Sequence, residues 1–197
     1  MEEITQLFSN LDFNWSIIES IAVFFSILYV LLAAKESIWC WVAAAISVVL
    51  YIYICYNAQL YPETGLQIFY FIMAIIGYYM WNKQGKEKIK HWSEIKHLLI
   101  ILSGAILTFF MGFYFSTYTN SQLPIIDSFT TVFSIIANYM VIKKVVGNWL
   151  YWIVIDAVSV YLYFSRDLHL TSLLFIAYTF IAIFGYFAWM KKMKTNA

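Results

Sequence analysis

Charged side chains are scarce in this sequence, and that scarcity excludes an ordinary soluble domain. Asp, Glu, Lys and Arg make up 12% of the 197 residues, whereas soluble proteins carry about 25%. Hydrophobic residues make up 63%. A chain with so few polar groups cannot cover itself with a hydrated surface, so much of its outside must face lipid.

Several signatures of other protein classes are also missing. The formal net charge is +1, which offers no electrostatic basis for binding nucleic acid. No glycine-rich phosphate loop occurs, and the N-terminus lacks the basic region and the cleavage site of a signal peptide. We therefore expect neither a built-in ATPase nor a cleaved leader.

The residues that usually bind metals or act as nucleophiles are few and scattered. The three histidines, His91, His97 and His169, lie in loops or at the ends of apolar segments, and their spacing forms neither a metal site nor a catalytic pair. Cys40 and Cys55 share one apolar run, where packing is a commoner role than a disulfide or a metal site. We expect no enzymatic activity, no metal and no cofactor.

Long apolar runs dominate the chain. A helix needs about 20 apolar residues to cross about 30 Å of hydrocarbon. The runs are continuously apolar rather than alternating, which predicts helices and not the strands of a barrel. The sequence thus predicts an all-α membrane protein, one domain over residues 1–197, with transmembrane helices at residues 16–34, 38–57, 62–81, 98–117, 124–142, 148–165 and 171–190.

The basic residues predict the orientation of these seven spans. If the N-terminus lies outside, every lysine between or after the spans falls on the inner side, and only Arg166 falls outside. Cytoplasmic loops of membrane proteins carry an excess of Lys and Arg. We therefore predict a multi-pass protein of the bacterial inner membrane with its N-terminus out and its C-terminus in.

The chain also matches itself at an offset of 108 residues. Lys35 aligns with Lys143, Trp41 with Trp149, and Gly77-Tyr78 with Gly185-Tyr186. Three helices at residues 16–83 thus repeat at residues 124–191, with 98–117 as a connector. Because four spans separate the matched helices, the two halves have the same orientation. This parallel 3+1+3 arrangement is like that of the SWEET sugar transporters, which favours transport.

The segment at residues 148–165 has a distinctive polar face. Trp149, Trp152, Asp156 and Ser159 are spaced three, seven and ten residues from the first, which places them on one face of a helix. Two indoles and a carboxylate there could stack on an aromatic ring and balance a positive charge. A carboxylate near the bilayer midplane indicates function by default. The alternative is an Asp that hydrogen-bonds a neighbouring helix, with Trp149 as an interfacial anchor.

Four other polar side chains fall within predicted spans. Gln67 and Tyr70 lie three residues apart, Tyr178 matches Tyr70 in the second half, and Asn138 lies mid-span. An amide and phenols could bind hydroxyl groups or a carboxamide of a substrate. The alternative is packing for the tyrosines and helix–helix hydrogen bonding for Asn138.

These residues resemble the PnuC family of bacterial vitamin transporters, and the resemblance covers nearly the whole chain. It is carried by Trp-x-x-Trp-x-x-x-Asp at 149–156, by Leu-Gln-Ile-Phe-Tyr at 66–70, and by Gly-x-x-x-Trp at the close of both repeats. The resemblance implies the 3+1+3 fold and a substrate site that includes Trp149, Trp152 and Asp156. It also implies facilitated diffusion of a vitamin that a cytosolic kinase then traps for pyridine nucleotide biosynthesis.

The resemblance leaves the substrate open. Nicotinamide riboside is the usual one, but its carriers often have Asn where this chain has Asp156 and Ser47. Those departures could mark the thiamine subgroup, and both vitamins are aromatic cations that suit a carboxylate. From a different class, the chain could be a membrane subunit that captures substrate for a separate energising module. Assembly into homo-oligomers is also left open.

Overall fold

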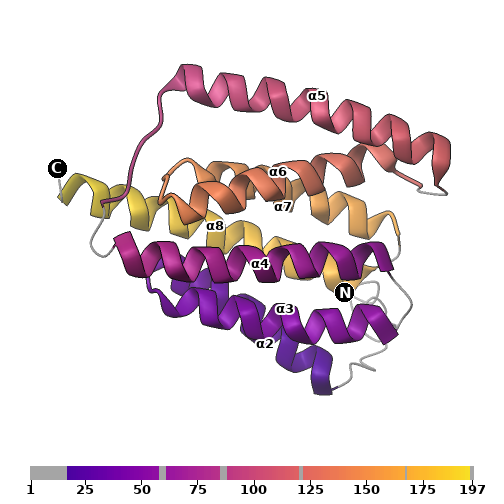
Figure 1. Cartoon of the computed structure of the whole chain (residues 1–197), viewed down its shortest axis with the longest axis horizontal. Coiled ribbons are helices and arrows are strands. Elements are labelled where there is room, and N and C mark those ends of the chain that lie inside the picture. Colours follow the sequence, from indigo (N-terminus) through magenta and orange to yellow (C-terminus); the bar gives the residue numbers. More distant parts are fainter. Residues whose placement is uncertain (1–16, 58–60, 85–87, 120–121, 167, 196–197) are drawn as a thin grey trace, which may run out of the picture.

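The computed structural model describes residues 17–57, 61–84, 88–119, 122–166 and 168–195. These residues form seven helices that run roughly along the long axis of the molecule (Figure 1). The helices are α2 (Ile17–Ala34), α3 (Trp39–Asn57), α4 (Tyr61–Gln84), α5 (Glu94–Tyr118), α6 (Pro124–Ile142), α7 (Asn148–Phe164) and α8 (His169–Thr195).

The predicted segments agree with these helices, and the differences lie at the ends. The helix predicted at 98–117 begins four residues earlier, at Glu94, and the helix predicted at 171–190 extends to Thr195. In both cases the added residues include lysines. An apolar run predicts the part of a helix in hydrocarbon, whereas the backbone hydrogen bonding continues into the polar headgroup region.

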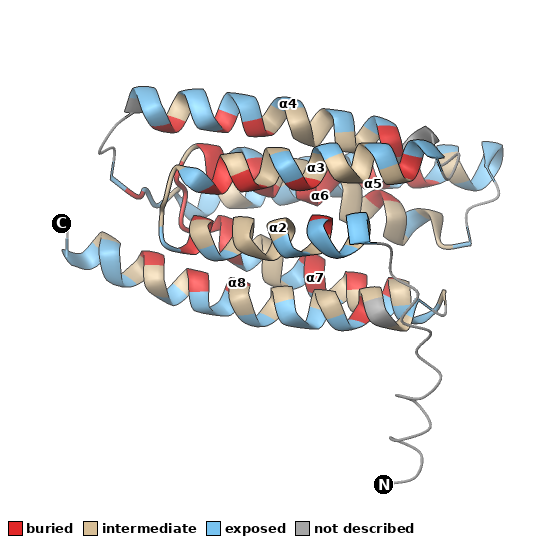
Figure 2. Ribbon diagram, turned by 90° about the horizontal axis from the view of Figure 1, so that it is seen from below, coloured by how far each residue is buried: buried red, intermediate tan, exposed pale blue. Residues whose placement is uncertain are grey.

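Length and composition fit a membrane protein. Among the described residues, six helices are long and apolar enough to span a bilayer, and α7, with 17 residues, lies at the lower limit. In each of these six helices, no more than half of the residues are buried inside the bundle (Figure 2). Exposed apolar side chains of this number would be costly in water and suit contact with lipid.

The helices pack in two groups that meet at two helix pairs. In the first group α2 packs on α3 and α3 on α4, while in the second α6 packs on α7 and α7 on α8. The groups meet where α2 contacts α8 and where α4 contacts α6. Helix α5 lies to one side and packs on α6 (Figure 1).

The core lies at one end of the bundle, where α2, α4, α6 and α8 end and where most lysines of the chain cluster. We call this the lysine-rich end. Its centre holds four tryptophans, each 3% exposed or less: Trp41, Trp81, Trp149 and Trp189. Two of these rings pack directly against glycines. Trp41 packs on Gly77, where an added Cβ atom would stand 2.5 Å from the ring, and Trp149 packs on Gly185, where the distance would be 2.7 Å.

At the same end, the segment before α5 pairs with the turn between α6 and α7 through its residue Lys90. The Lys90 backbone N–H donates to the Lys144 carbonyl at 2.8 Å, and the Val146 N–H donates to the Lys90 carbonyl at 2.9 Å. The following helix, α5, brings His97 within 3.1 Å of the Tyr151 hydroxyl on α7. The residues between α4 and α6 therefore hold the turn before α7 through the hydrogen bonds of Lys90 and contact α7 itself through His97.

Candidate functional site

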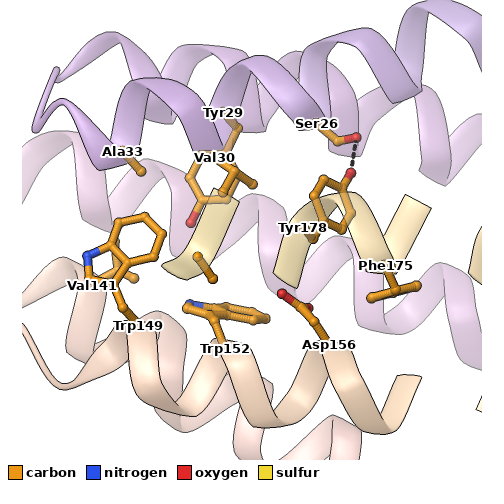
Figure 3. A pocket seen from close by; sticks show the side chains of 11 residues that line it. Ser26, Tyr29, Val30, Ala33, Val141, Trp149, Trp152, Asp156, Phe175 and Tyr178 are labelled. Carbon is orange, nitrogen blue, oxygen red and sulfur yellow. Dashed lines mark hydrogen bonds between the residues drawn. The ribbon is translucent and has the colours of Figure 1, made fainter. Parts of the chain in front are cut away.

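A cavity of about 170 Å³ lies between α2, α6, α7 and α8 (Figure 3). We call it the central cavity. It is lined by Ser26, Tyr29, Val30, Ala33, Val141, Trp149, Trp152, Asp156, Phe175, Tyr178 and Ala182. Its walls therefore come from both groups of helices, at the place where α2 meets α8.

Helix α7 supplies the chemically distinctive wall. Trp149, Trp152 and Asp156 all line the cavity, as their shared helical face predicts. Trp152 and Asp156 lie side by side and point toward the cavity (Figure 3). Trp149 is held in place by the edge of Trp189, with ring centroids 5.6 Å apart at 87°.

Asp156 is buried, yet its carboxyl group has no partner among the residues that the structure describes. Its exposed fraction is 4%, and within the described part of the chain no side chain donates a hydrogen bond or forms an ion pair with its carboxyl group. The Trp149 Nε1–H likewise finds no acceptor among the described residues. Buried polar groups normally have partners. The unpaired Asp156 carboxyl group on the cavity wall therefore favours the binding role over the structural one.

Helices α2 and α8 supply the opposite wall. The hydroxyl groups of Ser26 and Tyr178 are 2.6 Å apart, and the Tyr29 hydroxyl points toward α7 (Figure 3). Phenol rings on this side face the indoles on the other. An aromatic ring bound between them could stack or make edge contacts on both faces.

The sequence did not indicate the α2 residues of this wall. Ser26 and Tyr29 lie in a mostly apolar helix, and Tyr29 is one of 16 tyrosines in the chain. The repeat offers a signal, since Ser26 aligns with Ser134 and Tyr178 with Tyr70. Tyr70 and Ser134 lie close enough to interact, so the matching pair lies between α4 and α6 on the other side.

The other predicted site residues do not line the central cavity. Gln67 and Tyr70 lie on α4, Asn138 is buried on α6, and Ser159 is buried on α7 beyond Asp156. These four stay predictions.

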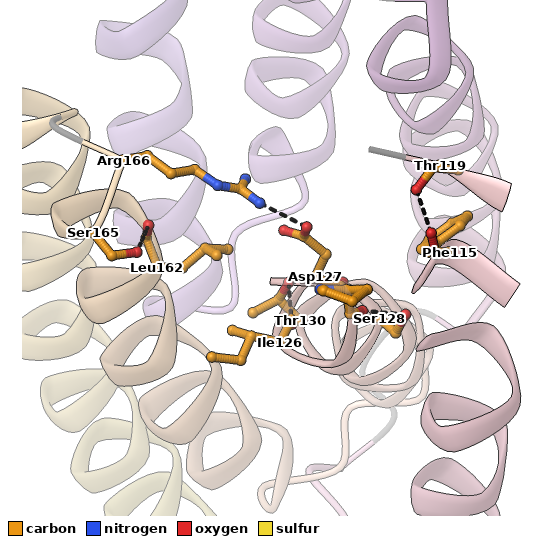
Figure 4. Close-up of polar contacts among 10 residues, drawn as sticks. Phe115, Thr119, Ile126, Asp127, Ser128, Thr130, Leu162, Ser165 and Arg166 are labelled. Carbon is orange, nitrogen blue, oxygen red and sulfur yellow. Dashed lines mark hydrogen bonds and ion pairs between the residues drawn. The ribbon is translucent and has the colours of Figure 1, made fainter. Parts of the chain in front are cut away.

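None of the described residues that line the central cavity is cationic, so none of them would compete with a bound organic cation for the Asp156 carboxyl group. Among the described residues no group of three or more His, Cys, Asp and Glu could hold a metal. At the far end of the bundle, Arg166 donates to Asp127 at 2.6 Å and so is paired away from the cavity (Figure 4). The arrangement suits a cationic aromatic solute.

A bundle of apolar helices around a cavity with a buried, unpaired carboxyl group defines the class of this protein: a multi-pass membrane transporter. The profile of the family described as nicotinamide mononucleotide transporter matches residues 16–191. The chain belongs to this family. The predicted resemblance to the PnuC transporters is thereby confirmed, and the function is transport rather than an enzymatic reaction.

Individual relatives agree with this assignment. The nicotinamide riboside transporter PnuC of Escherichia coli is 28% identical over 93% of this chain and 88% of its own length. The riboflavin/roseoflavin transporter RibM of Streptomyces davaonensis is 22% identical over 84% of this chain and 81% of its own. The crystal structure of the vitamin B3 transporter PnuC superposes with a TM-score of 0.75, at 26% identity, over 100% of this chain and 88% of that one. The relatives are bacterial, in line with the predicted inner-membrane location.

Proposed function

We propose that this chain imports nicotinamide riboside by facilitated diffusion. The observation that carries the proposal is the unpaired Asp156 carboxyl group beside Trp152 in the central cavity. The pyridinium ring of nicotinamide riboside is both aromatic and cationic, so it can stack on an indole while its charge meets the carboxylate. The nicotinamide riboside transporters among the relatives support this choice.

Thiamine is the second candidate. Its thiazolium ring also suits Asp156, and the Asp itself, where nicotinamide riboside carriers often have Asn, favours it. Riboflavin, the solute named for one relative, is uncharged and leaves the carboxyl group without a countercharge. The site chemistry therefore ranks both cations above riboflavin, and the relatives favour nicotinamide riboside over thiamine.

Calorimetry with the purified protein tests the substrate. We expect nicotinamide riboside to bind more tightly than thiamine and much more tightly than riboflavin. If thiamine binds more tightly, the transport proposal stands but the substrate is wrong. If neither cation binds, the central cavity is not the substrate site.

We also propose that the domain is a parallel 3+1+3 repeat with α5 as the connector and α7 as a full span. Support comes from matched contacts at the 108-residue offset: Trp41 on Gly77 and Trp149 on Gly185, and the contacts of α2 with α8 and of α4 with α6. The lysine-rich end would face the cytosol, with the N-terminus out and the C-terminus in.

Transport of this kind has no energy input of its own. A cytosolic kinase that phosphorylates the imported vitamin would maintain the inward gradient, and the chain would act alone or as a homo-oligomer. A capture subunit for an energising module would instead bind the vitamin without moving it. Uptake by the purified chain in sealed liposomes separates the two roles.

A further inference from the structure

Two turns at the lysine-rich end are joined by a buried ion pair. Glu36 lies between α2 and α3, and Lys144 lies between α6 and α7. The Lys144 Nζ donates to the Glu36 Oε1 at 2.8 Å, and these side chains are only 10% and 4% exposed. The two residues are 108 positions apart, so they occupy matching places in the two halves of the chain.

Both residues adopt a backbone conformation that normally belongs to glycine. Glu36 has φ 58° and Lys144 has φ 53°. Each turn has the two backbone hydrogen bonds of a helix-ending Schellman motif, for which glycine is the usual choice at this position. The left-handed conformation is unfavourable for residues with a Cβ atom. A charged residue in both turns is therefore costly locally, and such strain is concentrated at functional sites.

Next to these two strained turns, the two halves of the chain exchange tryptophan hydrogen bonds. The Trp189 Nε1–H donates to the Ala33 carbonyl at 3.0 Å, while the Trp81 Nε1–H donates to the Val141 and Ile142 carbonyls at 3.3 and 3.1 Å. Trp81 and Trp189 match at the repeat offset, and so do Ala33 and Val141. Each half thus supplies an indole that holds the end of the other half's first helix.

These contacts stand where the central cavity ends. Ala33 and Val141, the acceptors of the indole bonds, both line the cavity. The next residues along each chain segment lead directly to Glu36 and Lys144. The rings of Trp81 and Trp189 have centroids 6.4 Å apart, and Lys144 Nζ lies 5.1 Å from the Trp81 ring. The indoles and the ion pair thus follow the cavity-lining residues Ala33 and Val141 toward the lysine-rich end.

We propose that the Glu36–Lys144 ion pair and the two cross-donating tryptophans form the cytosolic gate of the transporter. The proposal rests on the transport function and the orientation proposed above. Substrate can leave toward the lysine-rich face only if the ends of α2 and α6 separate, which breaks the pair. Water would then hydrate both charges, which makes opening less costly than exposure of an apolar plug of similar size. The ion pair is thus suited to a gate that opens and closes.

Lys192 offers a matched control. Its Nζ lies 2.5 Å from the Glu36 Oε2, but its side chain is 48% exposed. Lys192 belongs to the last turn of α8 and not to either of the two turns that hold Glu36 and Lys144. Loss of its charge leaves the Glu36–Lys144 contact in place. Lys192→Gln should therefore leave the gate closed.

A cysteine at the cavity's end reports on the gate. Val141→Cys, on a background of Cys40→Ala and Cys55→Ala, is treated with a membrane-impermeant methanethiosulfonate on inside-out vesicles. Glu36→Asn and Lys144→Asn remove one charge each but keep a side chain that tolerates the left-handed turn. We expect each to speed labelling from the cytosolic face about tenfold or more, with Lys192→Gln near the parent rate. An unchanged rate in both Asn variants would overturn the gate.

Glu36→Asp keeps the result decisive if the Asn variants do not fold. Asp retains the charge and tolerates the turn but is one methylene shorter, so it should fold and label at an intermediate rate. A parent-like rate in Glu36→Asp, or faster labelling only from the outer face, contradicts the proposal. Binding of nicotinamide riboside to the parent protein is measured in parallel, so failure of the gate is distinguishable from failure of the proposed substrate.

Discussion

At the scale of single residues, Asp156 carries most of the functional argument. An ionised carboxyl group in apolar surroundings is costly unless it is paired. Its neighbours in the central cavity are rings, aliphatic side chains and the Ser26–Tyr178 pair, and none of them is cationic. The missing countercharge is what a cationic vitamin would bring.

The first prediction concerns the two α7 side chains beside each other in the cavity. Trp152→Ala should weaken binding of nicotinamide riboside by on the order of 1–3 kcal/mol, the range measured when an aromatic platform for a base is lost. Asp156→Ala should cost at least as much, because the ligand's charge would stay uncompensated. Calorimetry on the purified variants measures both.

A matched control for this pair is Trp39→Ala. Trp39 is 63% exposed on α3 and does not line the cavity, so its loss should leave the affinity unchanged. Asp156→Asn separates charge from hydrogen bonding, since it keeps the size of the side chain. Parent-like affinity in both alanine variants would remove α7 from the site.

At the scale of elements, the position of α7 against α8 depends on a tryptophan that packs on a glycine. A second prediction follows for Gly185→Ala. Its new Cβ would stand 2.7 Å from the rigid Trp149 ring, so the ring must shift. We expect a loss of stability of about 1–3 kcal/mol from overpacking. Because Trp149 lines the cavity, substrate affinity should fall as well.

Gly77→Ala is the matched change in the other half. It should destabilise the protein to a similar degree through Trp41, but Trp41 does not line the central cavity, so affinity should be retained. Apparent melting temperature in detergent and calorimetry separate the two effects. Equal loss of affinity in both variants would mean that the contact acts on the whole bundle and not on the site.

The ion pair at the lysine-rich end gives a third prediction. Burial raises the pKa of Glu36, but hydrogen bonds from Lys144 and Lys192 outweigh burial and hold that pKa below its usual 4.5. A lowered pKa means stability that is present above the unfolded value and is lost as pH falls through the folded value. The difference in melting temperature between the parent and Glu36→Gln should be full at neutral pH and shrink below pH 4.5. A difference that grows in acid would contradict this pairing.

At the scale of the whole molecule, the sequence predicted the seven helices well because apolar runs and lysine-rich turns follow from the bilayer itself. It also predicted eight substrate-binding residues. Four of them, Trp149, Trp152, Asp156 and Tyr178, line one cavity, whereas Gln67, Tyr70, Asn138 and Ser159 do not. Helical spacing determines which residues share a face of α7.

The other half of the cavity could not be predicted in the same way. Ser26 and Tyr29 are ordinary residues for a membrane helix, and their role depends on how α2 packs against α8. Such packing joins residues more than a hundred positions apart, and helix periodicity within one segment carries no information about it. The pairing of Glu36 with Lys144 was missed for the same reason.

The predicted topology provides the fourth prediction. Single cysteines are placed at Gln122 and at Lys88, on a background without Cys40 and Cys55. In intact cells they should differ in how fast an impermeant maleimide labels them. Both positions are exposed, one at each end of the bundle. With the lysine-rich end in the cytosol, Gln122→Cys should react and Lys88→Cys should react only after the membrane is permeabilised. The reverse pattern would invert the orientation.

We expect this chain alone to let nicotinamide riboside cross a membrane down its gradient, through a site that contains Asp156. The most direct measurement is uptake of radiolabelled nicotinamide riboside into sealed liposomes that contain only the purified protein. Without ATP or an ion gradient, the inside concentration should rise to the outside concentration and stop there, and Asp156→Ala should slow the rise markedly. Binding without uptake, or accumulation above the outside concentration when a proton or sodium gradient is imposed, would contradict the account.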